Sequence, residues 1–288
     1  MTESAHPHRI YLLGGLRAEA PGGPVAVPGG KPQALLAYLI LHPHTPHTRE
    51  QLMENFWPDV PAERAGRYLS NALYRLRASL GGEWLQVEEE RLGVQRDSVW
   101  VDVWEFERLA KSARAADWEQ ALALYAGDLL PEIYADWILL PRLSLRERFL
   151  AVLGQAAEQC ATDGRWPEAA GHLRRLVAAD PLNENAHRNL MHALARLGRV
   201  AEALRSFDEL RARLHRSRRE HGVPRVSAAG DPVTCALPML PRCGVTGPEP
   251  RLSIIPALRS ICKCASRSLA RAGWAATSAG GWRRRASR

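Results

Sequence analysis

Hydrophobic and polar residues alternate differently in three zones of this 288-residue chain. Residues 9–103 mix strand-like alternation with helical periodicity, residues 104–221 are helical almost throughout, and residues 222–288 have no sustained period. The pattern therefore predicts two folded domains, at residues 1–103 and 104–221, followed by a disordered tail at 222–288. The predicted fold class is mainly α with a small β component.

The first zone has the element order of a winged helix-turn-helix. Residues 9–18 (RIYLLGGLRA) alternate enough to predict one strand, and residues 22–30 (GGPVAVPGG) predict a short strand between Gly and Pro turns. Helical stretches follow at 31–43, 48–59 and 62–82, and residues 83–103 predict two or three short strands around a tight turn. Two strands, three helices and a hairpin in this order predict a DNA-binding fold with a small N-terminal sheet and a wing.

The third helical stretch has two different faces when its residues are placed at about 100° intervals around a helix. One face is apolar and predicts the core contact; it consists of Leu69, Leu73, Leu76 and Leu80. The opposite face consists of Arg64, Arg67, Asn71, Tyr74 and Arg75, with Arg77 on the flank. Residues 62–82 contain four Arg and one acidic residue, which is a local charge of +3.

A basic helix face is often only a solvated surface, but the position of this one favours DNA contact. It lies on the third helix of a helix-turn-helix order and precedes a candidate wing. A helix fits the major groove, where Arg pairs with guanine and Asn reads adenine. We therefore predict that Arg64, Arg67, Asn71, Tyr74 and Arg75 face double-stranded DNA. Arg77 suits a phosphate contact better than a base contact.

The second zone contains three similar helical pairs. A small residue in each second helix is followed four positions later by a bulky one, in the pairs Ala121 and Tyr125, Ala169 and Leu173, and Ala203 and Phe207. Ala169 and Ala203 are 34 residues apart, the tetratricopeptide period, whereas Ala121 and Ala169 are 48 apart, which is 34 plus an insertion of 14. The zone predicts stacked helical repeats with a groove for a protein partner, for which Tyr125, His172, Asn189 and His192 are candidate lining residues.

Several phrases in order carry a resemblance to a known family. They are GGKPQALLAYLILHP, TREQLMENFWPD, LSNALYRLRASLG, VDVWEFERLA and DPLNENAHRNLMHALARLGRVAEALRSFDELR. Over about residues 9–224 the chain resembles regulators with a bacterial transcriptional activator domain, the type found in antibiotic-regulatory (SARP) activators. The resemblance implies a response-regulator type of winged helix followed by a tetratricopeptide-like domain. It also implies promoter DNA binding, activation of transcription, and action as a dimer or on tandem sites, and we expect the helical domain to contact RNA polymerase, a second protomer, or both.

The net charge of +8 lies in the tail. Residues 225–288 contain eleven Lys and Arg against two acidic residues, a charge of +9, so residues 1–224 sum to −1. The charge of the whole chain is therefore no argument for DNA binding by the folded part. The abrupt change in charge, Cys content and periodicity after HGVP favours a tail read in a shifted frame; the alternative is a native basic tail that adds non-specific affinity for nucleic acid.

Other candidate chemistry is weak. His42, His44 and His47 lie in a Pro- and Thr-rich loop without supporting ligands, and the tail cysteines match no zinc pattern, so no metal is expected. Gly30-Lys31 lacks the P-loop spacing, and neither a nucleophile elbow nor a paired carboxylate is recognisable, so we expect no cofactor and no catalytic residue. Glu88–Glu90 predict an acidic hairpin tip, beside which Arg91 and Arg96 are candidate DNA-backbone contacts.

The first residues hold an acid and His where a secretory peptide has a basic start, and no apolar run reaches the roughly 18 residues of a membrane span. The sequence thus predicts a cytoplasmic transcription regulator without membrane contact. Two alternatives remain open. One is an interaction scaffold whose winged helix does not bind DNA, and the other is a truncated, inactive regulator.

Overall fold

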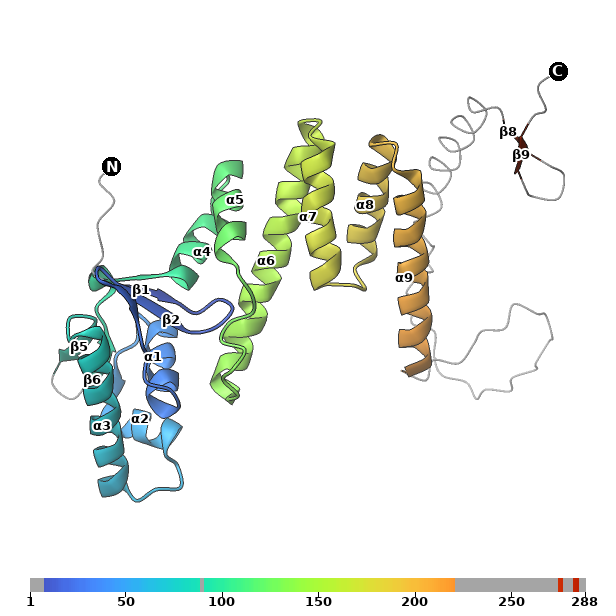
Figure 1. The fold of residues 1–288 in the computed structure, drawn as a ribbon. Helices are drawn as coiled ribbons and strands as arrows, with labels where there is room; N and C mark the ends of the chain where they lie inside the picture. Colours follow the sequence, from blue (N-terminus) through green and yellow to red (C-terminus); the bar gives the residue numbers. More distant parts are fainter. Residues whose placement is uncertain (1–7, 89–90, 221–273, 277–281, 285–288) are drawn as a thin grey trace, which may run out of the picture. The chain divides into compact units, whose positions relative to one another are not determined.

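The computed structural model describes residues 8–88, 91–220, 274–276 and 282–284. The chain divides into two compact units, residues 1–156 and residues 157–288. The described part is mainly helical with a small β component, as the sequence predicts. The first unit combines the winged helix-turn-helix with the helices that follow it, and the second contains the last helical repeats (Figure 1).

The N-terminal sheet of the first unit has the strand order β3 (Gly23–Val25), β2 (Arg17–Ala20), β1 (His8–Tyr11) and β7 (Val99–Val101). Neighbouring strands are antiparallel except for β1 and β7, which are parallel. The prediction of one strand over residues 9–18 is wrong, because the chain turns between β1 and β2 at Gly14, where φ is +85°, and Gly15, where φ is +127°. The strands predicted within residues 83–103 also divide between two sheets, because the last of them, β7, joins this sheet.

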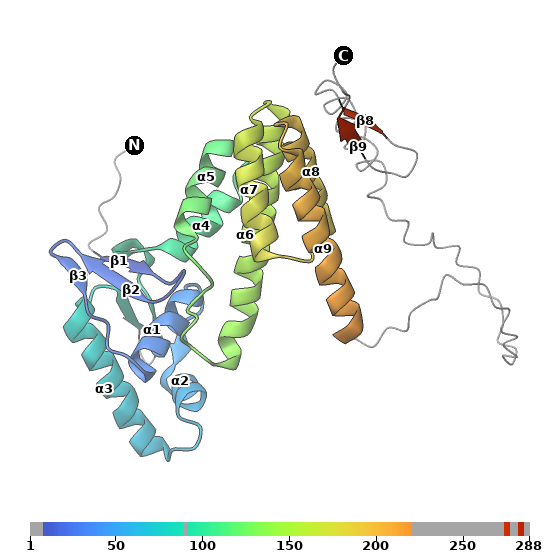
Figure 2. The same ribbon diagram turned by 45° about the vertical axis from the view of Figure 1, so that its right-hand side comes forward.

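Three helices lie below this sheet in Figures 1 and 2: α1 (Lys31–Leu41), α2 (Arg49–Phe56) and α3 (Ala62–Leu80). The side chain of Thr48 caps α2 and exchanges hydrogen bonds with Gln51, as the capping-box sequence Thr-Arg-Glu-Gln predicts. Helix α3 packs against both α1 and α2, and Leu35, Leu52 and Leu69 are completely buried in this core. Burying each such Leu stabilises the fold by about 1.5–3 kcal/mol.

The wing is a second, three-stranded antiparallel sheet. Its strand order is β4 (His47–Thr48), β6 (Arg91–Val94) and β5 (Leu85–Glu88). The buried side chains of Leu92 and Val94 anchor β6, which contacts α1. The short strand β4 therefore joins the wing to the residue that caps α2.

Helices α4 (Asp102–Ala110), α5 (Ala115–Leu124) and most of α6 (Asp136–Thr162) belong to the first unit. The loop between α5 and α6 lies on the N-terminal sheet: the N–H of Gly14 donates to Asp128 O at 2.9 Å, and that of Leu130 to Leu12 O at 3.0 Å. A Cβ at Gly127 would lie 3.1 Å from the Cα of Gly14, so this close approach favours glycine at position 127. Contacts of this unit thus continue past residue 103, and the domain boundary there stays a prediction.

In the second unit, α7 (Trp166–Ala179), α8 (Glu184–Arg196) and α9 (Val200–Glu220) pack side by side (Figures 1 and 2). The repeat alanines Ala169 and Ala203 are completely buried, as the period predicts. The insertion of 14 residues lengthens α6 to 27 residues instead of forming a separate element. Of the predicted tail, only the antiparallel strands β8 (Trp274–Ala276) and β9 (Trp282–Arg284) are described, and the predictions of disorder and of a shifted frame otherwise lie outside the described residues.

Candidate nucleic-acid interface

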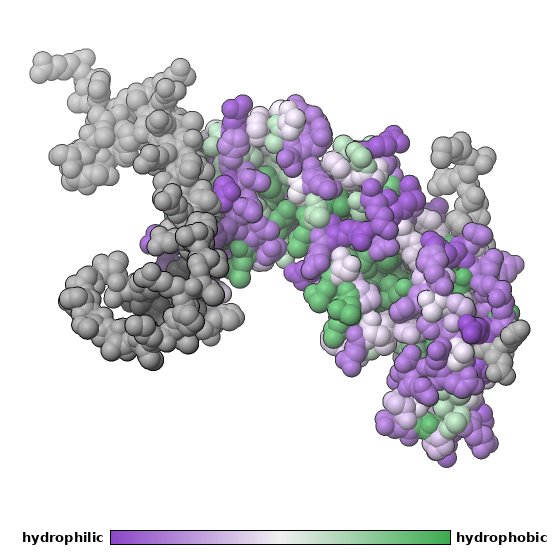
Figure 3. Space-filling model, turned by 180° about the vertical axis from the view of Figure 1, so that it is seen from behind, coloured by the Kyte–Doolittle hydropathy of each residue, from purple (hydrophilic) through white to green (hydrophobic). Residues whose placement is uncertain are grey.

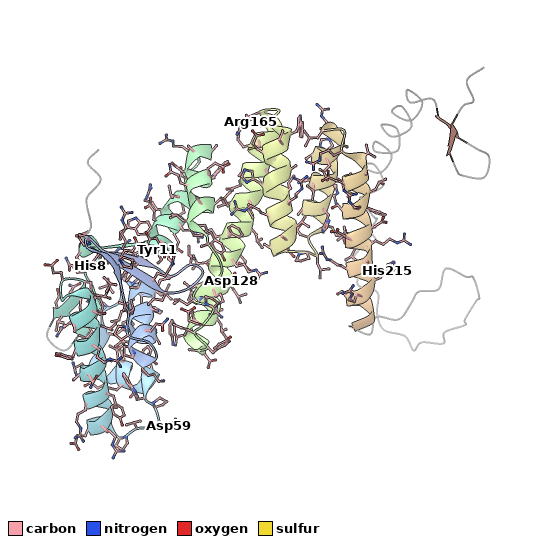
Figure 4. All side chains as sticks on the ribbon, viewed as in Figure 1. His8, Tyr11, Asp59, Asp128, Arg165 and His215 are labelled. Atoms are coloured by element: carbon pink, nitrogen blue, oxygen red, sulfur yellow. The ribbon has the colours of Figure 1, made fainter. Side chains whose placement is uncertain are left out.

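The two faces of α3 are separated as the periodicity predicts. The apolar stripe is buried, with Leu69 and Leu76 at 0% exposure and Leu73 and Leu80 at 4% and 1%. All six predicted DNA-contact residues are exposed: Arg64, Arg67, Asn71, Tyr74, Arg75 and Arg77. Tyr74 is 73% exposed, so its ring is open to a partner. Figure 4 shows the side chains along α3, with Asp59 in the loop that leads into its N-terminus.

One member of this basic face contacts an acid on the same helix. Arg67 Nη2 lies 3.4 Å from Glu63 Oε1, and both side chains are strongly exposed. An exposed pair one helical turn apart stabilises a helix by only a few tenths of a kcal/mol. A phosphate or a base edge can therefore replace Glu63 as the partner of Arg67 at little cost.

The structure adds a residue to this region that sequence reasoning missed. Arg49 is the first residue of α2, and its Nη2 donates a 2.8 Å hydrogen bond to Ser70 Oγ on α3. Arg49 therefore links the first residue of one helix to the exposed side of the next. Its position directly after the capping residue Thr48 was the sequence signal that could have identified it.

The wing contributes one exposed cation within the described residues. Arg91 is exposed and pairs across the sheet with Thr48. Arg96 has other contacts: it is hydrogen-bonded to His44 Nε2 at 2.9 Å, and its guanidinium lies 4.9 Å from the centre of the Trp104 ring. Arg96 is thus occupied within the unit, whereas Arg91 remains available at the surface. Residues 89–90 of the predicted acidic tip lie outside the described residues.

The histidine loop serves packing. The ring of Tyr38 lies 4.4 Å from that of His42 and 4.9 Å from that of His47. His47 is only 6% exposed, and burial, with a smaller effect of His42, lowers the pKa of its imidazole below the usual value. The result is an aromatic cluster at the entry to α2 in which burial disfavours the charged form of His47.

The groove residues predicted in the helical repeats divide into two kinds. Tyr125 and His172 are buried, at 8% and 9% exposure, so they offer a partner little surface, and their place in a groove stays a prediction. Tyr125 instead stacks on Phe149, with ring centres 4.0 Å apart and planes 9° from parallel. Asn189 and His192 are exposed, as a surface role requires.

Comparison with known proteins decides what kind of molecule carries this face. Residues 101–223 match the family model of the bacterial transcriptional activator domain, and residues 28–91 match that of the C-terminal domain of transcriptional regulatory proteins. The regulatory protein DnrI of Streptomyces peucetius is 30% identical over 229 residues, which cover 72% of this chain and 84% of DnrI. The chain belongs to the family of SARP-type regulators with a bacterial transcriptional activator domain. The match confirms the resemblance recognised in its sequence.

Other relatives agree with this assignment. The regulatory protein AfsR of Streptomyces griseus is 30% identical over 216 residues, or 70% of this chain and 22% of AfsR. A solved structure of Mycobacterium tuberculosis EmbR in complex with a low affinity phosphopeptide has a TM-score of 0.62 and 19% identity, and the alignment covers 95% of this chain and 73% of EmbR. At that identity EmbR shows the fold alone. As a SARP-type regulator, the protein is a DNA-binding transcriptional activator.

The two family matches fall on different parts of the fold. The segment 28–91 contains α1, α2, α3 and the wing strand β5, and it includes all six predicted contact residues and Arg49. The segment 101–223 begins at the end of β7 and contains α4–α9. Among the described residues, no helix combines the length and the apolar character needed to cross a membrane.

Proposed function

We propose that this SARP-type regulator inserts α3 into the major groove of promoter DNA and reads bases through Arg64, Arg67, Asn71, Tyr74 and Arg75. The observation that carries the proposal is the exposure of this basic face directly opposite a buried leucine stripe. The stripe holds the helix in the fold, so the basic side chains face outward without unpacking the core. Arg77, on the flank, takes a phosphate.

The residues differ in what they contribute. A bidentate Arg–guanine or Asn–adenine pair is worth about 1–3 kcal/mol of discrimination against a wrong base. Phosphate contacts through Arg77, Arg49 and Arg91 set the register and give salt-dependent affinity without sequence information. Arg49 has a second role, since its hydrogen bond to Ser70 positions α3 relative to the start of α2.

Activation further requires a protein contact, for which the first half of α6 is the candidate surface. Tyr134 is 91% exposed, and Leu139, Leu140 and Leu143 are 50%, 77% and 56% exposed. Figure 3 shows hydrophobic side chains gathered over this end of α6. Exposed apolar side chains grouped in this way mark protein contact sites. RNA polymerase or a second protomer is the proposed occupant, and the regulator acts in the bacterial cytoplasm without catalysis or a cofactor.

Fluorescence anisotropy of the full chain with labelled DNA from its own upstream region tests the proposal. We would measure it at two salt concentrations for the wild type and for Arg67→Ala/Asn71→Ala/Arg75→Ala. Salt-sensitive binding that this triple variant loses is the expected result. Because the basic tail is present in every sample, the difference between variants reports on α3.

The matched control is Asn189→Ala/Arg211→Ala/Arg216→Ala, which removes the same residue types from exposed positions of the second unit. Its binding should equal that of the wild type. Equal loss in both triple variants would assign the affinity to overall charge and contradict a role for α3. Absence of binding even to random duplex at low salt would favour the alternative of an interaction scaffold or an inactive regulator.

A further inference from the structure

A cleft of about 320 Å³ lies among α7, α8 and α9 in the second unit. Its walls include the apolar side chains of Val177, Leu190 and Leu194, which are 8%, 5% and 2% exposed. Charged residues from α7 and α9 also line the cleft, namely Arg174, Arg205, Arg213, Glu202 and Glu209. The cleft thus combines an apolar floor with a charged rim, a composition typical of sites that bind a small segment of a ligand.

The charges of this cleft do not balance. Three arginines face two glutamates. Glu202 is engaged by Arg174, at 3.2 Å, and also by Arg199, which lies outside the cleft lining. One of the two carboxylates is therefore shared between two guanidinium groups, which leaves Arg205 and Arg213 with Glu209 as the other acid of the lining.

Arg213 carries the strongest indication of a missing partner. Its Nη1 atom is buried, and within the described part of the chain it has no hydrogen-bond partner. Buried donors are normally satisfied, and a buried cationic donor requires an anion or several acceptors to offset its lost hydration. A carboxylate that enters the cleft would supply both a negative charge and hydrogen-bond acceptors for this guanidinium.

The neighbouring polar groups do not meet this need. His187 is completely buried; its Nε2 contacts Pro181 O at 3.3 Å and its Nδ1 contacts Ser206 Oγ at 2.9 Å. Because a carbonyl oxygen only accepts, Nε2 carries the proton and Nδ1 accepts from the Ser206 hydroxyl. The Ser206 proton is therefore directed away from the cleft, which leaves the arginines as its main donors.

We propose that this cleft binds a short acidic segment of a partner protein. A carboxylate of the segment lies against Arg205 and Arg213, and an adjacent apolar side chain packs on Leu190 and Leu194. The two glutamates of the lining disfavour a polyanion such as DNA, whereas a single carboxylate next to an apolar group matches both parts of the cleft. The site is distinct from α3 and does not depend on how α3 contacts DNA.

Selection of peptides from a random octapeptide library against the full chain tests the proposal. The expected result is enrichment of Asp or Glu beside Leu, Ile, Val or Phe. The affinity of a selected fluorescent peptide would then be compared among the wild type, Arg213→Gln and Arg205→Gln. Each substitution should weaken binding by about tenfold or more, as expected for loss of a charged hydrogen-bond partner.

Arg211→Gln is the matched control, because Arg211 is exposed on α9 and is absent from the cleft lining. Arg211→Gln should change the affinity for the peptide by less than about twofold, because residues outside the contact surface contribute little to binding. Arg205 is exposed, so its substitution reports on binding without disturbing the core. Selected peptides without acidic residues, equal binding by Arg213→Gln and the wild type, or displacement of the peptide by double-stranded DNA would each overturn the proposal.

Discussion

The carboxylate of Asp102, at the start of α4, accepts a 2.9 Å hydrogen bond from the backbone N–H of Leu12, 90 residues earlier in the chain. It also accepts from the N–H groups of Leu13 and Val103, and only 1% of the residue is exposed. This carboxylate satisfies backbone donors at the end of the first strand, which would otherwise be buried without partners. It therefore joins the N-terminal sheet to α4.

Substitution Asp102→Asn should destabilise the first unit by about 1–3 kcal/mol, because an amide nitrogen would face backbone donors and leave them unsatisfied. Denaturant unfolding of the full chain measures this loss. Glu105→Gln, on the same helix, is the control, since its carboxylate contacts the exposed Arg108. Equal stabilities of the two variants would contradict a role for the buried carboxylate.

The same carboxyl group should make stability depend on pH. Burial, against the opposing effect of its backbone hydrogen bonds, raises the pKa of Asp102 from 3.8 to about 6. As pH falls, the folded state therefore takes up the proton before the unfolded state does. The contribution of Asp102 to the free energy of unfolding is greatest below the pKa of the unfolded state, 3.8, and is lost as pH rises through about 6. The free energy of unfolding of the wild type, relative to that of Asp102→Asn, should therefore increase as pH falls from 7 to 4. A difference that does not change with pH would contradict this prediction.

A fall in pH should lower the stability of the second unit through the buried residue His187. Burial lowers the pKa of His187 below its usual 6.5, so the unfolded chain binds the proton first as pH falls. The stability that the neutral imidazole contributes is present above 6.5 and is lost below it. As pH falls from 7.5 to 5.5, the melting temperature measured by thermal unfolding should decrease less in His187→Gln than in the wild type. His192→Gln, which removes an exposed imidazole from the same helix, is the matched control variant.

Replacing Arg77 by Ala should weaken binding to all DNA sequences by a similar factor. Arg77 lies on the flank of α3, where a phosphate contact suits it better than a base contact, and loss of one phosphate contact lowers the slope of log affinity against log salt by about 1. Anisotropy titrations over a salt series give this slope. Asn71→Ala provides the contrast, because it should change the preference among base sequences and leave the slope nearly intact. An Arg77→Ala effect confined to one DNA sequence would assign Arg77 to base reading.

Substitution Leu140→Glu should separate DNA binding from activation. Leu140 is 77% exposed, so the change should alter folding stability by less than about 0.5 kcal/mol. DNA affinity should be unchanged, whereas transcription from the target promoter with purified RNA polymerase should decrease if the α6 patch contacts a protein partner. Gln155→Glu, at an exposed polar position of α6 farther from the patch, controls for the added charge. Full activity of Leu140→Glu would remove the patch from the proposed mechanism.

The amino-acid sequence alone determined the features that depend on neighbours a few residues apart. The separation of Leu69 and Leu76 from Asn71 and Tyr74 follows from the helical period, and the cap at Thr48 follows from side chains within one turn. The burial of Ala169 and Ala203 follows from a repeat that is visible in the chain. These patterns were sufficient to predict the winged helix-turn-helix, the helical pairs and the outward direction of the basic face.

Only the tertiary structure decided which distant segments meet. Residues far apart in the chain are joined by the parallel pairing of β7 with β1 and by the hydrogen bonds of Asp102 with Leu12 and Leu13. Local periodicity does not predict such contacts. The same holds for Arg213, whose surroundings come from three helices, and for Tyr125, which is buried against Phe149. A residue's own sequence neighbours set the face on which it lies, whereas its burial and its partners depend on how the whole chain packs.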